Sequence, residues 1–204
     1  MKTLKNYIIE AVTPKFANNK EGIISFCEYV FNPKFVKYIV NSDLTITLES
    51  NTPSDILNMD TKDLTEIPDF IVFSNIEKYH LGLGYDCRKL KHWAPKVNGY
   101  CSGFVVDDNA KIQTLDFSNC EIKDGKLFIQ KTAVKSIIGP KGEDVQIYIK
   151  QNKNLDELDL KQIKSCMDPG SYIFNNKRLE IDLSKLPKGI YIENNKLKEK
   201  HYKS

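Results

Sequence analysis

The hydrophobic period of the sequence changes near residue 42, and this change constrains the fold more than any other feature. Before it, apolar residues recur every three or four positions, as on one face of a helix. Such runs predict helices over residues 4–12, 18–31 and 33–39, with Asn18 and Glu21 as a capping box for the second. After residue 42 apolar and polar residues alternate, as in Leu44, Ile46 and Leu48, which indicates strands.

The second part of the chain contains signals that predict hairpins. Asp124-Gly125 lies between two apolar-rich arms, and the segments YIFNNKRLEI and YIENNKLKEK each place Asn-Asn after Tyr-Ile. We interpret this near-repeat as two turns, because it is too short to indicate a solenoid. One helix is expected near residues 155–167, with Asn154 as its cap and Pro169-Gly170 after its end.

These patterns predict an α+β fold, with N-terminal helices followed by a hairpin-rich antiparallel sheet and one crossover helix. The expected organisation is a helical segment over residues 1–42 and an antiparallel β-rich domain over residues 43–204.

Bulk composition excludes several classes of protein. The 30 basic and 27 acidic residues give a formal net charge of +3, which provides no general attraction to nucleic acid or to an anionic membrane. The five cysteines are odd in number and form no C-x-x-C pair, which suits a reducing compartment rather than a disulfide framework. The sequence has the pattern of neither a signal peptide nor a membrane span, so we expect a soluble intracellular protein that is not secreted by a signal peptide.

Residues 79–101 gather the residue types of a zinc site. His80, Cys87, His92 and Cys101 are separated by six, four and eight residues, whereas zinc knuckles place two ligands on one tight turn. We therefore predict no metal and no cofactor, and we expect Trp93, with Tyr85, to be partly buried and to hold a long loop against the sheet.

One carboxylate pattern predicts an alternative function. Asp107 and Asp108 follow a strand-like segment, and Glu121 and Lys123 follow after a turn. This Asp…Glu-x-Lys order resembles that of the restriction-endonuclease-like nucleases, which implies a divalent ion on the carboxylates and a lysine that helps to activate water. The competing interpretation is a set of solvent-facing charges on a hairpin.

A second alternative is a small intracellular nucleic-acid-binding module. Arg88, Lys89 and Lys91 stand beside Trp93, and basic residues next to aromatic ones can bind single strands by charge and stacking. The competing interpretation is a solvated lysine-rich loop with one anchoring tryptophan.

The two ends of the chain resemble known families. The opening MKTLKNYIIEA is similar to the starts of virion proteins of crAss-like tailed bacteriophages, over eleven residues. The segment LPKGIYIENNKLKEK is similar to the last hairpin of the sorting domain on secreted Bacteroidetes proteins, whose secretion we do not carry over because no signal peptide is predicted.

The first resemblance, and the lack of a convincing catalytic constellation, lead to the main functional hypothesis. We expect a non-enzymatic structural or assembly protein of a tailed phage virion, made in the host cytoplasm. Its partners would be other virion proteins and copies of itself, with no membrane partner.

The amphipathic helix expected at residues 4–12 is the element that we expect to contact a partner. A helix of about 12 residues is marginal alone in water, so its apolar face must pack on its own domain or in a groove of a neighbouring subunit. That face consists of Leu4, Tyr7, Ile8, Ala11 and Val12.

Overall fold

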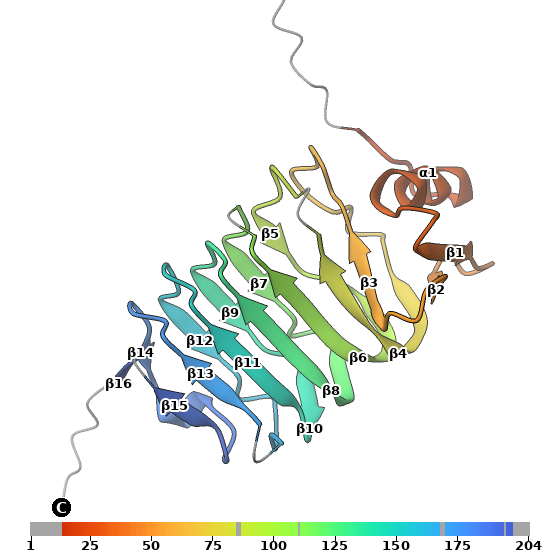
Figure 1. Cartoon of the computed structure of the whole chain (residues 1–204). Coiled ribbons are helices and arrows are strands. Elements are labelled where there is room, and N and C mark those ends of the chain that lie inside the picture. Colours follow the sequence, from red (N-terminus) through yellow and green to blue (C-terminus); the bar gives the residue numbers. More distant parts are fainter. Residues whose placement is uncertain (1–13, 85–86, 110, 168–169, 194, 198–204) are drawn as a thin grey trace, which may run out of the picture.

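The computed structural model is an elongated stack of β-strands with one helix at its N-terminal end (Figure 1). It describes residues 14–84, 87–109, 111–167, 170–193 and 195–197. The chain winds repeatedly through the same two layers, so that each coil places one strand beside the equivalent strand of the preceding coil.

The main sheet is parallel except at its N-terminal edge, where β1 and β2 pair antiparallel. Its strands, in spatial order, are β1 (Val36–Val40), β2 (Ile46–Ser50), β4 (Phe73–Leu83), β6 (Val97–Asp107), β8 (Glu121–Gln130), β11 (Gln146–Lys150), β13 (Tyr172–Phe174) and β15 (Tyr191–Glu193). Two further strands pair at the side of this path, β3 (Ile56–Met59) with β4 and β10 (Lys141–Glu143) with β8.

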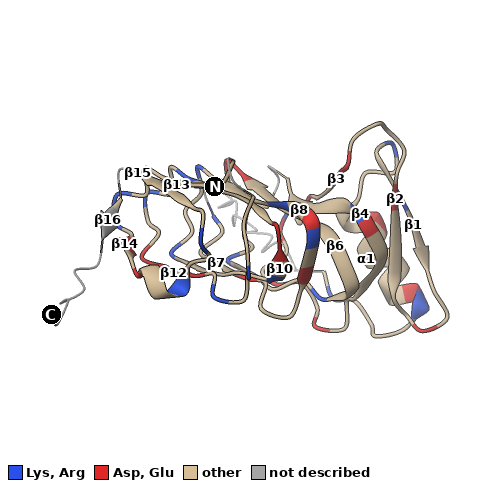
Figure 2. Ribbon diagram, turned by 90° about the horizontal axis from the view of Figure 1, so that it is seen from below, with Lys and Arg blue, Asp and Glu red and all other residues tan. Residues whose placement is uncertain are grey.

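A second, smaller parallel sheet covers the main sheet, and the two layers are seen edge-on in Figure 2. Its strands are β12 (Glu157–Asp159), β9 (Ser136–Ile138), β7 (Thr114–Asp116) and β5 (His92–Trp93). At the C-terminal end β14 (Glu180–Ile181) pairs with β16 (Lys196–Leu197), and a 3₁₀ turn, η1, spans Leu183–Lys185.

The coils repeat because the hydrophobic pattern repeats. From β6 to β15, register partners on neighbouring strands lie 19 to 24 residues apart. One coil shows the pattern clearly, since five of its aliphatic residues are buried in the core: Ile147, Ile149, Leu155, Leu158 and Leu160. The order hydrophobic-x-hydrophobic-x-x-Asn is similar to that of leucine-rich repeats, which stack as solenoids because one repeat alone cannot bury its apolar face.

An asparagine ladder follows the main-sheet strands from β6 to β15. We use this name for a column of polar residues from successive coils, of which the first four are buried and the last is half-buried: Asn109, Thr132, Asn152, Asn176 and Asn195. The side-chain oxygen of each of the last three accepts a hydrogen bond from the backbone N–H of the preceding member, at 2.8–3.0 Å. The ladder therefore joins successive coils through buried polar groups that would be costly to leave unpaired.

The residue before each of the first four ladder positions has a left-handed backbone. Asp108, Lys131, Gln151 and Asn175 have φ values of 50°, 50°, 59° and 57°. Side chains other than glycine and asparagine adopt this conformation at a cost. Its recurrence in four successive coils shows that the turn geometry is imposed by the stack rather than by local sequence.

Helix α1 (Lys20–Val30) covers the N-terminal end of the core. The Asn19 side chain accepts a hydrogen bond from the N–H of Gly22 at 2.8 Å, and Ile23, Phe26 and Val30 are buried. The helix thus shields apolar side chains of the first coil, as a capping element of a solenoid must.

The predicted fold class was wrong, because the main sheet pairs in parallel over long sequence distances instead of in hairpins. Asp124-Gly125, predicted as a hairpin turn, lies inside β8, which continues through it. Asp124 has φ 46°, so its left-handed preference is used for an irregularity at which the register between β6 and β8 shifts.

Two predicted helices are also absent from the described part of the chain. Residues 33–39 form a turn and most of β1, and residues 155–167 contain β12 and loops. The helix expected at residues 18–31 is present, with Asn19 rather than Asn18 as its cap. The helix expected at residues 4–12 lies outside the described residues.

Candidate functional site

A row of aromatic side chains crosses the outer face of the main sheet. Inward-facing positions of each strand fill the core, and the residue between them points away from it. In four successive strands this outward residue is aromatic and in register with the next: Phe128, Tyr148, Tyr172 and Tyr191, which we call the aromatic row.

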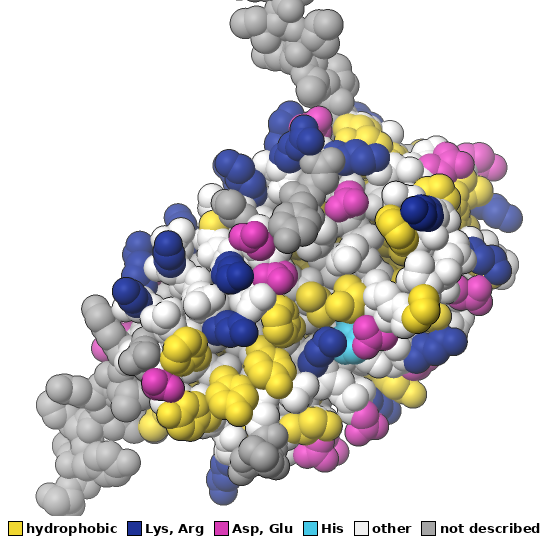
Figure 3. Space-filling view, viewed as in Figure 1, with side chains coloured by type: hydrophobic (Ala, Val, Ile, Leu, Met, Phe, Trp, Pro, Cys, Tyr) yellow, Lys and Arg dark blue, Asp and Glu magenta, His cyan; other side chains and the backbone are white. Residues whose placement is uncertain are grey.

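The rings of the aromatic row contact one another. Successive ring centroids are 5.9, 5.9 and 5.8 Å apart, with interplanar angles of 56°, 25° and 72°. Tyr172 remains 39% exposed and Tyr191 55% exposed. Figure 3 shows the resulting apolar patch over β8, β11, β13 and β15. Scattered apolar residues are normal on a protein surface, but a contiguous aromatic strip indicates a binding site.

The row ends where the outward side chains become small. The equivalent positions on the two preceding strands are Val105 and Gly82. Gly82 leaves no room for a larger residue, since an added Cβ would lie 2.2 Å from Oδ1 of Asn58. The strip is therefore confined to the C-terminal coils.

Charged groups flank the row asymmetrically. Lys126 and Lys150 lie beside its Phe128 end, and Nζ of Lys150 is 5.8 Å from the Phe128 ring centroid. Glu193 lies beside the other end, where its charge and a hydrogen bond raise the pKa of the Tyr191 hydroxyl. The strip thus has a positive end and a negative end.

His80 is a buried titratable group on the outward face of β4. Its Nδ1 lies 3.3 Å from Oδ2 of Asp55. Burial lowers the pKa of His80, the charge of Lys126 lowers it further, and Asp55 opposes both effects. The imidazole is therefore neutral near pH 7. His80 lies between Ile56 of β3 and Gly103 of β6, its register partners.

The predicted nuclease residues do not come together in this fold. Asp107 is the register partner of Gln130 at the end of β8, whereas Glu121 begins the same strand. On β6, Cys101 lies level with the start of β8 and is six residues from Asp107, roughly 20 Å at 3.3 Å per residue. Asp108 lies on the turn after Asp107, and Lys123 pairs with Glu121 at 3.6 Å, so the four residues cannot share one metal ion.

The four residues considered for zinc are also dispersed. His80 lies on the main sheet and His92 on the second sheet, where it contacts the Thr114 hydroxyl. Cys87 and Cys101 are both buried. Over the described ranges, no group of three or more histidine, cysteine or acidic residues is placed to hold a metal ion.

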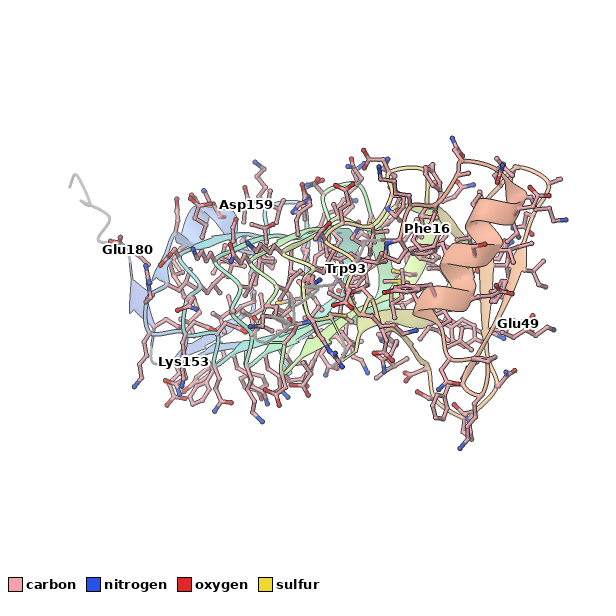
Figure 4. The ribbon with its side chains drawn as sticks, turned by 90° about the horizontal axis from the view of Figure 1, so that it is seen from above. Phe16, Glu49, Trp93, Lys153, Asp159 and Glu180 are labelled. Atoms are coloured by element: carbon pink, nitrogen blue, oxygen red, sulfur yellow. The ribbon has the colours of Figure 1, made fainter. Side chains whose placement is uncertain are left out.

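Trp93 cannot act as a stacking surface for bases. It is 1% exposed and packs edge-on against Phe104 and Phe117, with centroids 5.9 and 5.5 Å away. Figure 4 shows it between the two layers of the stack. Trp93 was expected to be partly buried and to hold a loop, whereas it is fully buried in the core. Tyr85 lies outside the described residues.

The basic residues predicted beside it are exposed. Arg88, Lys89 and Lys91 lie on the turn that leads into β5, on a different edge of the stack from the aromatic row. They line one hollow together with Lys111 and Lys135 from later coils.

The predicted interface residues Leu4, Tyr7, Ile8, Ala11 and Val12 lie outside the described residues. The aromatic row was not predicted. Its signal is the recurrence of an aromatic residue directly before an isoleucine in each of the four strands, which becomes visible once the repeat of 19 to 24 residues is recognised.

Comparisons with protein-family models, with curated proteins and with solved structures find no match to this chain. Within the described residues, no helix has the length and apolar character needed to cross a membrane.

Proposed function

We propose that this chain is a non-enzymatic assembly protein that docks onto other protein through the aromatic row. The observation that carries this proposal is the set of four consecutive, in-register, partly exposed aromatic side chains on one sheet face. Tyrosine is enriched at protein interfaces because its ring buries a large apolar area while its hydroxyl still finds a hydrogen-bond partner.

The arrangement of the rings favours a protein over a sugar or a base as the ligand. Tyr148 and Tyr172 stack on each other at 25°, so each covers a face of its neighbour. A flat ligand that stacks needs a free ring face, whereas a protein surface can pack against ring edges and hydroxyl groups. The stacked pair in the middle of the row therefore offers mainly ring edges and hydroxyl groups.

The charges at the two ends favour a second copy of this chain as the occupant. If two rows pack face to face in opposite directions, Phe128 of one chain lies over Tyr191 of the other. This two-fold arrangement places Glu193 of each chain near Lys150 of the other. Neither of these two side chains forms an ion pair within the described part of the chain; Glu193 hydrogen-bonds Tyr191 and Lys150 lies over the Phe128 ring, so each charge is held at one end of the row.

The contact is small. The row covers three strand spacings, roughly 14 Å. Interfaces at the small end of the range are weak, so we expect a dimer with a Kd of about 10 µM or weaker.

Sedimentation velocity of the whole chain from about 5 to about 500 µM tests the proposal. We expect the mean sedimentation coefficient to rise with concentration, and the double variant Tyr172→Ser/Tyr191→Ser to stay monomeric. Phe35→Ser is the matched control, because Phe35 is 47% exposed on the turn before β1, far from the row. A wild-type chain that stays monomeric throughout, or equal loss of association in the control, would refute docking of a second copy.

The more specific hypothesis, that the assembly is a tailed phage particle, rests on the opening eleven residues, which lie outside the described residues. Mass spectrometry of purified particles tests it separately. Detection at structural stoichiometry supports a virion role, and absence from the particle removes it while leaving self-association to be judged on its own.

A further inference from the structure

A second surface, independent of the aromatic row, runs along the turns that follow the main-sheet strands. Two adjacent hollows of about 590 and 850 Å³ lie there and share Ala133 and Asn154 in their walls. Asp108 is the one acidic residue among the described residues that line them. The basic residues that line them define what we call the basic edge: Arg88, Lys89, Lys91, Lys111, Lys131, Lys135, Lys153 and Lys177.

The solenoid aligns these lysines. Lys131, Lys153 and Lys177 each lie next to a member of the asparagine ladder, and Lys111 lies two residues beyond one. Lys153 and Lys177 hold equivalent positions in consecutive coils, so their side chains begin about one strand spacing apart, roughly 4.8 Å. Lys111 and Lys131 lie on the corresponding turns of the two preceding coils. The dark-blue side chains along the upper left edge in Figure 3 show this gathering of positive charge.

The positive charge of the edge is largely uncompensated within the chain. All seven lysines are exposed, and Lys89 is paired with Asp63 at 3.5 Å. The other six form no ion pair within the described ranges. Acidic residues gather instead around the second sheet, and Figure 4 shows Lys153 and Asp159 on opposite sides of the stack. The small net charge of +3 therefore hides a strongly positive edge.

We propose that the basic edge binds the phosphate backbone of double-stranded nucleic acid without reading its sequence. A linear array of lysines suits a linear polyanion, and duplex DNA has one negative charge per about 1.7 Å of its axis. Lysine binds phosphate as a point charge and needs no fixed geometry.

The described walls of the two hollows contain no aromatic residue, which favours a duplex over a single strand as the ligand. Single-strand binders combine a basic groove with aromatic platforms on which bases stack. None of the described residues that line the hollows is aromatic, and Trp93, two residues from Lys91, is buried in the core. Amide side chains lie between the lysines instead, among them Gln113, Gln151 and Asn175, and these can donate to phosphate oxygens.

The test measures binding of a fluorescein-labelled 20-base-pair DNA duplex to the whole chain by anisotropy, between about 50 and about 200 mM salt. With four phosphates neutralised, the slope of log K against log salt should be about −3.6, which weakens binding about 150-fold over this range.

Two quadruple variants, each lowering the formal net charge from +3 to −1, separate the edge from bulk charge. Binding should be lost when glutamine replaces the edge lysines Lys111, Lys131, Lys153 and Lys177. Binding should be largely retained when glutamine replaces four exposed lysines elsewhere, Lys20, Lys34, Lys78 and Lys188. Circular dichroism melting of both variants confirms that each remains folded.

Four results would overturn the proposal. These are undetectable binding at the lowest salt, equal loss in the control variant, tighter binding of the matching single strand, and displacement of the duplex by polyglutamate at equal charge. The last two would assign the edge to single strands or to acidic protein segments. None of them bears on sedimentation of the aromatic-row variants, so the two proposals fail or succeed separately.

Discussion

Replacing Asn152 by alanine should cost far more than its small volume suggests. Its Oδ1 accepts hydrogen bonds from the backbone N–H of Thr132 at 3.0 Å and from the Thr132 hydroxyl at 2.8 Å. Its Nδ2 donates to the carbonyl oxygen of Ile129 and to Oδ1 of Asn176, both at 3.1 Å. Alanine leaves the Thr132 N–H and the Ile129 carbonyl without these partners in a buried turn. Each such group costs about 1–3 kcal/mol, and we expect a loss of about 3 kcal/mol in the free energy of unfolding.

Urea unfolding followed by circular dichroism measures this loss, and fluorescence of Trp93 reports separately on an earlier coil. Because each coil contacts only its neighbours, the C-terminal coils of the variant can unfold first, and the two signals should then separate. The matched control is Asn154→Ala, an exposed asparagine two residues further on, which should change stability by less than about 0.5 kcal/mol. A loss below about 1 kcal/mol for Asn152→Ala, or a loss equal to that of the control, would show that the ladder does not hold the coils together.

Three further predictions test other features of the fold. Gly103→Ala should destabilise the protein by more than about 2 kcal/mol, since the φ of Gly103 is 140° and its new Cβ would lie 1.8 Å from the Lys126 carbonyl oxygen. Gly99→Ala, with φ 90° but open space around it, should cost only about 1 kcal/mol in the same urea titration. Burial lowers the pKa of His80 in the folded state, so the unfolded chain binds its proton more tightly. Stability should therefore fall as pH decreases below the ordinary histidine value of about 6.5, and a His80→Gln variant should show a smaller fall between pH 7.5 and 5.5. Burial also raises the pKa of Cys101 and Cys120 to about 12, so a thiol reagent at pH 8 should label them at the rate of unfolding, and rapid labelling of native protein would contradict their burial.

Local sequence signals predicted one helix and one strand correctly, whereas the helices expected at residues 33–39 and 155–167 were wrong. The stripe Ile23, Phe26, Val30 indicated helix α1, and the alternation at Ile46 and Leu48 indicated a strand, because each depends on neighbours within one element. Asp124-Gly125 was predicted as a hairpin turn, whereas Asp124 takes a left-handed backbone, φ 46°, inside β8. Both a turn and an irregular strand position can use that backbone, so the pair alone does not distinguish them.

The long-range pairing could not be read from these local signals. A parallel pair joins residues about 20 positions apart, and nothing within a single strand specifies whether its neighbour is parallel. The informative signal was the near-repeat of Tyr-Ile and Asn-Asn at residues 172–176 and 191–195, interpreted as two separate turns. These segments are two successive coils, with Tyr172 paired to Tyr191 and Asn176 bonded to Asn195. Two copies are too few to establish a repeat, and the earlier copies are concealed by changes such as Thr132 in a ladder position.

The candidate surfaces were harder to predict than the fold, because they are made of positions that the core does not constrain. Lys89 and Lys91 were noted from the sequence, but Lys153 lies more than 60 residues further on, and only the stack brings the three to one edge. The aromatic row was invisible for the same reason, since Phe128 and Tyr191 belong to coils that are not consecutive in the sequence.

The repeat itself explains how one small chain can carry two distinct surfaces. Inward positions are restricted to apolar residues and ladder positions to short polar ones, so variation is confined to the strand faces and turns. Tyr148 and Lys153 belong to the same coil and are five residues apart, roughly 16 Å of chain, yet the ladder residue Asn152 between them turns the backbone onto another edge. The coils from β8 to β13 make the same turn. An outward residue of a strand therefore lies on the face of the aromatic row, and a lysine of a turn lies on the basic edge. Each surface can therefore lengthen or change its chemistry by one residue per coil while the core and the other surface stay the same.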